Sequence, residues 1–194
     1  QKTGVRRSNI DIYLVCHHQH CVYPREAGYQ PGAPYFLKII INGEVVTDQF
    51  DTDEIMYDAV KMYPGDISFT TVSASSTIKN LKAMVNGKRT ATHSPGPNGL
   101  PGGYPVILDE KGATINLPDE ILLEDAIRMN KESGKLDSIE EIKDDGTVVF
   151  ADYAYEIMKD TLGFDCRSFK PHDSENLAFE QIARFKELSN KYIQ

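Results

Sequence analysis

The predicted fold depends on one stretch of the chain, ISFTTVSASSTIKNLKAMVNGKRTATH (residues 67–93). Its first part, Ile67–Val72, is rich in β-branched and aromatic side chains, which is typical of a strand. The polar run Ser73–Thr77 then offers several N-cap residues, and apolar residues recur at helical spacing up to Asn86-Gly87. Arg89–His93 is expected to form a second strand. The stretch therefore predicts a βαβ unit, with two parallel strands and a right-handed crossover.

The segments on either side of this unit predict further strands, hairpins and helices. Asn42-Gly43 between two apolar runs is a strong hairpin signal. Together the segments predict an α/β or α+β fold, with a mixed β-sheet that has at least one parallel βαβ unit and helices packed on it. We expect the other strands at 9–16, 36–41, 45–50, 104–108, 113–117, 139–142 and 147–150, and helices from Asp51, Pro118, Asp152 and Asp173 or Ser174.

The length of the chain, 194 residues, is enough for one domain with its own core. The alternative division is a core at 1–118 and a helical C-terminal subdomain at 119–194. The sequence begins with Gln1 and not with Met, so we expect a fragment of a longer chain.

Charge and composition exclude several classes of partner. The net charge of −8 argues against a nucleic-acid partner. No apolar run approaches the roughly 18 residues that a membrane helix needs, and no secretory signal is present, so we expect no membrane partner. Three cysteines, an odd number, do not suggest a disulfide framework. These features predict a cytoplasmic protein.

The predicted βαβ unit places two polar segments at one edge of the sheet, where ligands bind in open α/β sheets. One is the run at 73–77, where free backbone N–H groups at a helix start would attract an anion and hydroxyls would add donors. These residues can equally be plain N-caps. The candidate substrate-binding residues here are Ser73, Ser75, Ser76 and Thr77.

The second segment is the loop PGPNGLPGG (residues 95–103), which follows His93. Its glycines lack the spacing of a P-loop or of a dinucleotide fingerprint, so we exclude nucleotide phosphate binding by it. Prolines stiffen the loop, and glycines allow a ligand to approach the backbone. This pattern of prolines and glycines predicts that the loop forms either a rigid wall of a pocket or a simple crossover turn. The candidate substrate-binding residues here are Ser94, Asn98, Gly99, Gly102, Gly103 and Tyr104.

The segment CHHQHC (residues 16–21) contains possible metal ligands, namely Cys16, His17, His20 and Cys21. Its C-x₄-C spacing is looser than that of a zinc knuckle, and no second ligand pair follows. If the preceding strand continues, His17 and His18 point to opposite faces of the sheet. The other interpretations are a histidine general acid or base, and plain packing. The candidate catalytic residues are His17, His18 and His93.

Two segments resemble a known class of protein: THSPGPNGLPGGYPV (residues 92–106) and IEEIKDDGTVVFADYAYEIMKDTLGFD (residues 139–165). They resemble the C-terminal half of two-domain oxidoreductases whose N-terminal Rossmann domain binds a nicotinamide dinucleotide. The resemblance implies NAD or NADP, bound mainly by a domain absent from this chain, because no strand–Gly-x-Gly-x-x-Gly–helix unit occurs here. It also implies that the three candidate histidines face the nicotinamide or the substrate, and that polar substrate groups are held by Ser73, Ser75, Ser76 and Asn98.

Three functions stay open at this point. The first is the substrate-binding and catalytic or oligomerisation domain of an NAD(P)-dependent oxidoreductase that acts on a small polar substrate. The second is a metal-binding protein or metal-dependent hydrolase that uses His17–His20. The third is a non-enzymatic dimerisation or binding module. The expected partners are a small-molecule substrate, an N-terminal Rossmann domain and a second copy in a homodimer.

Overall fold

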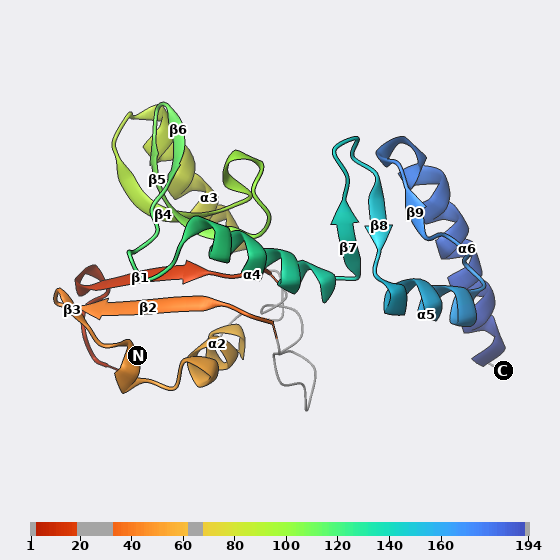
Figure 1. The fold of residues 1–194 in the computed structure, drawn as a ribbon, viewed down its shortest axis with the longest axis horizontal. Helices are drawn as coiled ribbons and strands as arrows, with labels where there is room; N and C mark the ends of the chain where they lie inside the picture. Colours follow the sequence, from red (N-terminus) through yellow and green to blue (C-terminus); the bar gives the residue numbers. More distant parts are fainter. Residues whose placement is uncertain (1–2, 19–32, 62–67, 193–194) are drawn as a thin grey trace. The chain divides into compact units, whose positions relative to one another are not determined.

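A computed structural model describes residues 3–18, 33–61 and 68–192 of the chain. They belong to two compact units, Gln1–Ser133 (unit 1) and Gly134–Gln194 (unit 2) (Figure 1). The described strands form three three-stranded sheets, and all of their pairings are antiparallel. The chain therefore mixes helices and strands, as predicted, but the expected parallel pair does not form among the described residues.

The first sheet of unit 1 has the strand order β1-β2-β3. The residues Asn42 and Gly43 both have positive φ, 52° and 85°, as the two central residues of a type I′ hairpin turn do. The predicted hairpin is therefore confirmed, although its second strand is short. The elements are η1 (Arg7–Asn9), β1 (Ile10–Val15), β2 (Phe36–Ile41), β3 (Glu44–Val45) and η3 (Thr47–Gln49).

The helix α2 (Thr52–Lys61) follows directly. The Asp51 side chain accepts a hydrogen bond from the Glu54 backbone N–H at 3.0 Å. That bond satisfies one of the free N–H groups at the helix start, so the predicted start at Asp51 is confirmed.

The segment that was expected to begin the βαβ unit is helical instead. The helix α3 (Ser68–Val85) contains all the described residues of the predicted strand at 67–72, and it also contains the predicted turn Ser73–Thr77. Intrinsic helix propensities of ordinary residues differ by only about 0.7 kcal/mol, so β-branched residues do not exclude a helix. Thr77 is accommodated because its hydroxyl donates to the Ser73 carbonyl at 3.0 Å. The strand prediction is wrong here, and the parallel unit is lost with it.

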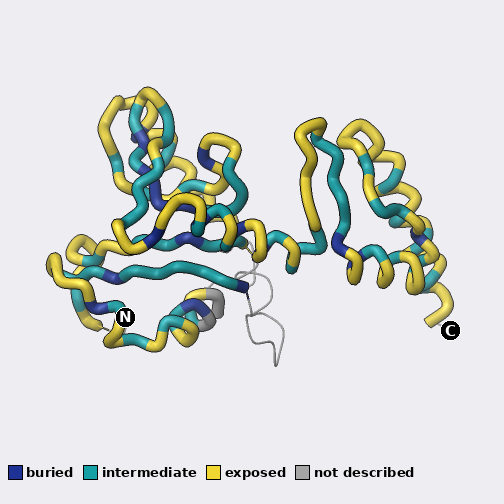
Figure 2. The backbone as a smooth tube through the Cα atoms, in the orientation of Figure 1, coloured by how far each residue is buried: buried dark blue, intermediate teal, exposed yellow. Residues whose placement is uncertain are grey.

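The second sheet of unit 1 has the order β4-β5-β6, with β5 in the centre. Tyr104, Val106 and Leu108 alternate along β5 and enter the core of unit 1 beside Val15 and Ala126; Figure 2 shows this part of β5 as buried. The predicted hairpin around 110–112 is confirmed. The elements are β4 (Thr90–Pro95), η4 (Pro97–Gly99), β5 (Gly103–Asp109), β6 (Gly112–Ile115) and α4 (Leu123–Lys135).

Unit 2 begins within α4 and contains the third sheet, with the order β7-β8-β9. Its predicted hairpin and both of its predicted helices are confirmed. Gly163 ends α5 with φ 63°, the left-handed conformation that favours glycine after a helix. The elements are β7 (Ile139–Ile142), β8 (Val148–Phe150), α5 (Asp152–Leu162), β9 (Ser168–Phe169), η5 (Pro171–Asp173) and α6 (Ser174–Tyr192).

None of the helices formed by the described residues combines the length and the apolar character that a bilayer span requires.

Candidate functional site

A small hollow in unit 1, here called the His93 pocket, lies where β1 meets β4 and β5. Its volume is about 160 Å³. It brings together four of the predicted site residues with Cys16, which the sequence had suggested only as a metal ligand. The lining residues are Leu14, Cys16, His93, Ser94, Pro95, Gly103 and Tyr104.

Two hydrogen bonds from different strands build this pocket. The Gly103 N–H donates to the Cys16 carbonyl at 3.0 Å. A side chain at Gly103 would bring its Cβ to 3.1 Å from the same carbonyl oxygen, so glycine permits the close approach of β1 to β5. The Leu14 N–H donates to His93 Nε2 at 3.2 Å. The imidazole therefore closes the gap between β1 and β4.

The Leu14 bond sets the tautomer of the neutral His93 ring. A ring nitrogen that accepts a hydrogen bond carries no proton, so the neutral ring holds its proton on Nδ1. His93 is an exposed residue of β4, but its Nε2 accepts the Leu14 N–H of β1. Burial first, and then the Lys79 ammonium, lower the pKa of His93 from its ordinary value of 6.5. At neutral pH the ring can donate through Nδ1, and it cannot act as a base at Nε2 unless the Leu14 bond breaks.

This arrangement predicts how the stability of unit 1 depends on pH. Because folding lowers the pKa of His93, the unfolded chain takes up the proton first as the pH falls, and the free energy of unfolding decreases from about pH 6.5 downward through the folded pKa. His93→Gln is expected to flatten this slope, since the amide oxygen accepts the Leu14 N–H without titrating. The measurement is urea unfolding between about pH 8 and pH 5, read from amide signals of β4 and β5.

The matched control for this prediction is His172→Gln. His172 lies in η5 of unit 2, and its side chain is 73% exposed. This variant is expected to keep the wild-type pH slope at β4 and β5. A His93→Gln protein with an unchanged slope contradicts the assignment of the titrating group.

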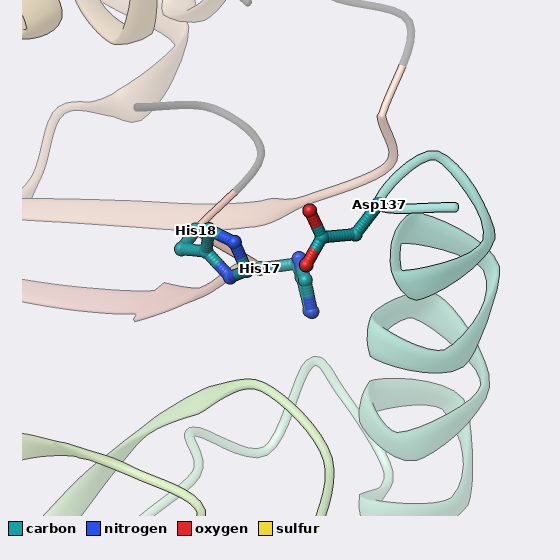
Figure 3. Close-up of side chains that lie close together, drawn as sticks. All are labelled: His17, His18 and Asp137. Carbon is teal, nitrogen blue, oxygen red and sulfur yellow. The ribbon is translucent and has the colours of Figure 1, made fainter. Parts of the chain in front are cut away.

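His17 and His18 follow the end of β1 and lie side by side. Their ring centroids are 4.4 Å apart and the rings are tilted by 36°; Figure 3 shows both rings, and also draws Asp137, which follows α4 in unit 2. The opposite orientation expected for a continuing strand is not found, because β1 ends at Val15 and the alternation of a strand ends with it. His20 and Cys21, the other histidine and cysteine of the predicted metal set, lie outside the described residues.

The polar run Ser73–Thr77 does not line the His93 pocket. It lies within α3, and its residues are exposed. The expectation of free N–H groups at these positions is wrong, because N–H groups in the interior of a helix are bonded within the helix. Ser75 lines a different hollow, on the exposed side of α3.

Two residues of the glycine-rich loop hold the loop in place. Asn98, with φ 55°, donates from its side-chain amide to the Ala113 carbonyl of β6 at 3.2 Å. Gly102, with φ 74°, lies directly against the buried Asn130 of α4. Around Gly99 nothing approaches the position of a Cβ within 4 Å. Only the two ends of the loop, at Pro95 and Gly103, line the His93 pocket.

Unit 2 contains a polar cluster that the sequence analysis did not single out. Tyr155 donates to Asp165 at 2.5 Å, and Lys159 contacts the Tyr155 hydroxyl at 3.1 Å and the Asp165 carboxylate at 3.2 Å. The bond from Tyr155 and then the one from Lys159 lower the pKa of Asp165. The i, i+4 spacing of Tyr155 and Lys159 on α5 was the available signal. The cluster links α5 to the segment before β9.

Comparisons of the chain with protein-family models, with curated proteins and with solved structures give no match. The resemblance of residues 92–106 and 139–165 to oxidoreductases therefore stays a prediction.

Proposed function

We propose that unit 1 binds a small molecule through a carbonyl or carboxylate oxygen in the His93 pocket. The observation that carries this proposal is the bond from the Leu14 N–H to His93 Nε2, which leaves Nδ1–H as the ring donor. Ligand sites are typically apolar hollows with a few polar groups that orient the ligand. Leu14 and Pro95 supply apolar lining, and Cys16 also lines the pocket.

The volume of the pocket limits the size of the ligand that it can hold. Sites for drug-sized molecules have volumes of roughly 300–1,000 Å³, whereas this pocket has about 160 Å³. A short-chain acid, aldehyde or ketone fits this volume. The proposal agrees with the small polar substrate expected from the sequence.

The oxidoreductase function is a proposal that rests on the resemblance of residues 92–106 and 139–165. In that reaction a hydrogen-bond donor near the substrate oxygen stabilises the charge that develops on it during hydride transfer, and His93 is the residue of this pocket suited to that role. NAD or NADP would be bound mainly by an N-terminal Rossmann domain. The reading frame upstream of the Gln1 codon tests this: a strand–Gly-x-Gly-x-x-Gly–helix unit is expected there, and a stop codon in its place contradicts the proposal.

Binding at the His93 pocket is tested by NMR titration of the whole chain with butyrate and with butanone. We expect saturable shifts at residues 14–16, 93–95 and 103–104. His93→Leu is expected to weaken binding about tenfold, the effect of one lost hydrogen bond in an apolar site. His172→Leu is the control and leaves binding unchanged. If neither probe shifts these residues, or if both variants lose binding equally, the proposal is wrong.

A further inference from the structure

We infer that unit 1 carries a second ligand site, which binds the phosphate group of a small soluble molecule. The site is an open hollow of about 440 Å³ between the C-terminal half of α3 and the start of β4, here called the basic groove. The groove shares no lining residue with the His93 pocket. The inference therefore does not rest on the function proposed above. Its polar lining residues are Ser75, Lys79, Lys82, Asn86, Lys88 and Thr90.

Helix geometry explains why these side chains gather. Ser75, Lys79, Lys82 and Asn86 follow one another at spacings of four, three and four residues, which places them on one face of a helix. α3 ends at Val85, and Gly87 adopts φ 62° in the turn that follows. The chain then enters β4, so that Lys88 and Thr90 form the remaining side of the groove.

The basic groove concentrates positive charge in a chain whose net charge is −8. Lys79 donates to the Ala91 carbonyl at 3.3 Å, which holds its ammonium at the edge of β4. Its positive charge also contributes to the lowered pKa of His93. In the described part of the chain no ion pair engages Lys82 or Lys88.

The Glu110 carboxylate lies close to the turn at Gly87 and reduces the positive charge at that end of the groove. Oε2 of Glu110 lies 2.9 Å from the position that a Cβ on Gly87 would occupy. Glu110 does not line the groove. The groove itself is lined by three ammonium groups and by no carboxylate among the described residues, so its lining is positive and favours a dianion over a monoanion by Coulomb attraction.

The chemistry of the lining favours a phosphate. An ammonium group is a point charge with three donors, and lysine commonly binds phosphate in this way. The Ser75 hydroxyl and the Asn86 amide add neutral donors for the remaining phosphate oxygens. Ile78 and Ala83 supply an apolar side of the groove for the rest of the ligand.

The observations favour a small soluble ligand over an extended polyanion. The volume of about 440 Å³ falls within the range of roughly 300–1,000 Å³ for single small ligands. The net charge of −8 repels a nucleic acid or an anionic membrane beyond the groove itself. A small soluble phosphomonoester contacts only the groove, so the negative charge of the rest of the protein repels it less.

Isothermal titration calorimetry of the whole chain with glycerol 3-phosphate and with inorganic pyrophosphate tests the inference. We expect saturable binding that weakens as salt is added. The double variant K82Q/K88Q is expected to weaken binding by at least about tenfold, since each lysine contributes a charge-assisted bond. R6Q/K131Q, which alters two exposed basic residues elsewhere in unit 1, removes the same charge and is expected to change binding less than about twofold.

Lys82 on α3 and Lys88 in the segment after it are both exposed, so we expect their substitution to leave the fold intact. The thermal midpoint of each variant is measured first to check this. Equal weakening by both double variants, or no saturable heat with either probe, overturns the inference. Two further probes test the source of the phosphate: a single-stranded RNA oligonucleotide and phosphatidylcholine vesicles containing phosphatidic acid. Binding of either one more tightly than glycerol 3-phosphate, with loss in K82Q/K88Q, overturns the assignment to a small soluble ligand.

Discussion

Gly102→Ala is expected to lower the free energy of unfolding of unit 1 by about 3 kcal/mol or more. A Cβ at Gly102 would lie 2.2 Å from Cγ of Asn130, and Asn130 is fully buried. Overpacking a core costs roughly 1–3 kcal/mol. The left-handed φ of 74° at this position adds about 1–2 kcal/mol for any residue with a Cβ. The measurement is urea unfolding followed at amide signals of β5, which report on unit 1.

Gly99→Ala is the matched control. Gly99 has nearly the same φ, 78°, but nothing lies within 4 Å of its Cβ position. It should show only the backbone cost of about 1–2 kcal/mol. Adding Asn130→Ala to Gly102→Ala removes the clashing atoms and is expected to recover part of the loss. Equal losses in Gly99→Ala and Gly102→Ala would mean that the contact with Asn130 is not the cause.

Tyr104→Ala is expected to produce a similarly large loss, about 3–5 kcal/mol, as for other large aromatic side chains removed from a core. Tyr104 is fully buried on β5 and belongs to the core cluster with Val15, Val106 and Leu108. The removed ring leaves a cavity between β5 and α4 that rigid neighbours fill only in part.

Tyr104→Phe separates the contribution of the ring to the free energy of unfolding from that of the hydroxyl. Burial raises the pKa of Tyr104, and the Asn130 amide opposes part of that rise. Even so, neither the Tyr104 hydroxyl nor Oδ1 of Asn130 forms a hydrogen bond of acceptable geometry in the described part of the chain. Removing an unsatisfied buried hydroxyl costs little, so Tyr104→Phe is expected to stay within about 1 kcal/mol of wild type.

The control for the tyrosine series is Tyr192→Ala, because Tyr192 is 82% exposed and exposed substitutions change stability by about 0.5 kcal/mol or less. If Tyr104→Phe loses as much as Tyr104→Ala, the hydroxyl is bonded in solution, and a buried water between Tyr104 and Asn130 is the physical explanation.

Sequence reasoning succeeded where a local signal decides the backbone. Asn42-Gly43 predicted the first hairpin, Asp51 the start of α2, and Gly163 the end of α5. In each case the residue itself adopts the backbone conformation of the turn or bonds a free group at the helix terminus. No contact with a distant residue is needed.

The same reasoning failed in the stretch 67–93, at the point on which the predicted topology depended. Ser68–Val72 are helical, and the following run Ser73–Thr77 continues the helix. Residues of this kind differ little in their preference for helix or strand, so packing decides between them. Asn80 of α3 bonds to Thr92 and to the His93 carbonyl of β4, and these contacts between distant residues cannot be read from the pattern.

Local sequence signals were enough to predict that helices and strands are mixed, where the hairpins lie and where most of the helices lie, because turn and cap residues act on their own neighbours. Long-range packing, in contrast, makes every described strand pairing antiparallel and brings β1 to β4 and β5. The tautomer of the neutral His93 ring follows from a partner 79 residues away, Leu14. The basic groove likewise forms because a helix face and the strand after it fold together. Both sites are formed by residues that are distant in the sequence and adjacent only in the fold. Local conformational propensity does not specify which distant residues come together.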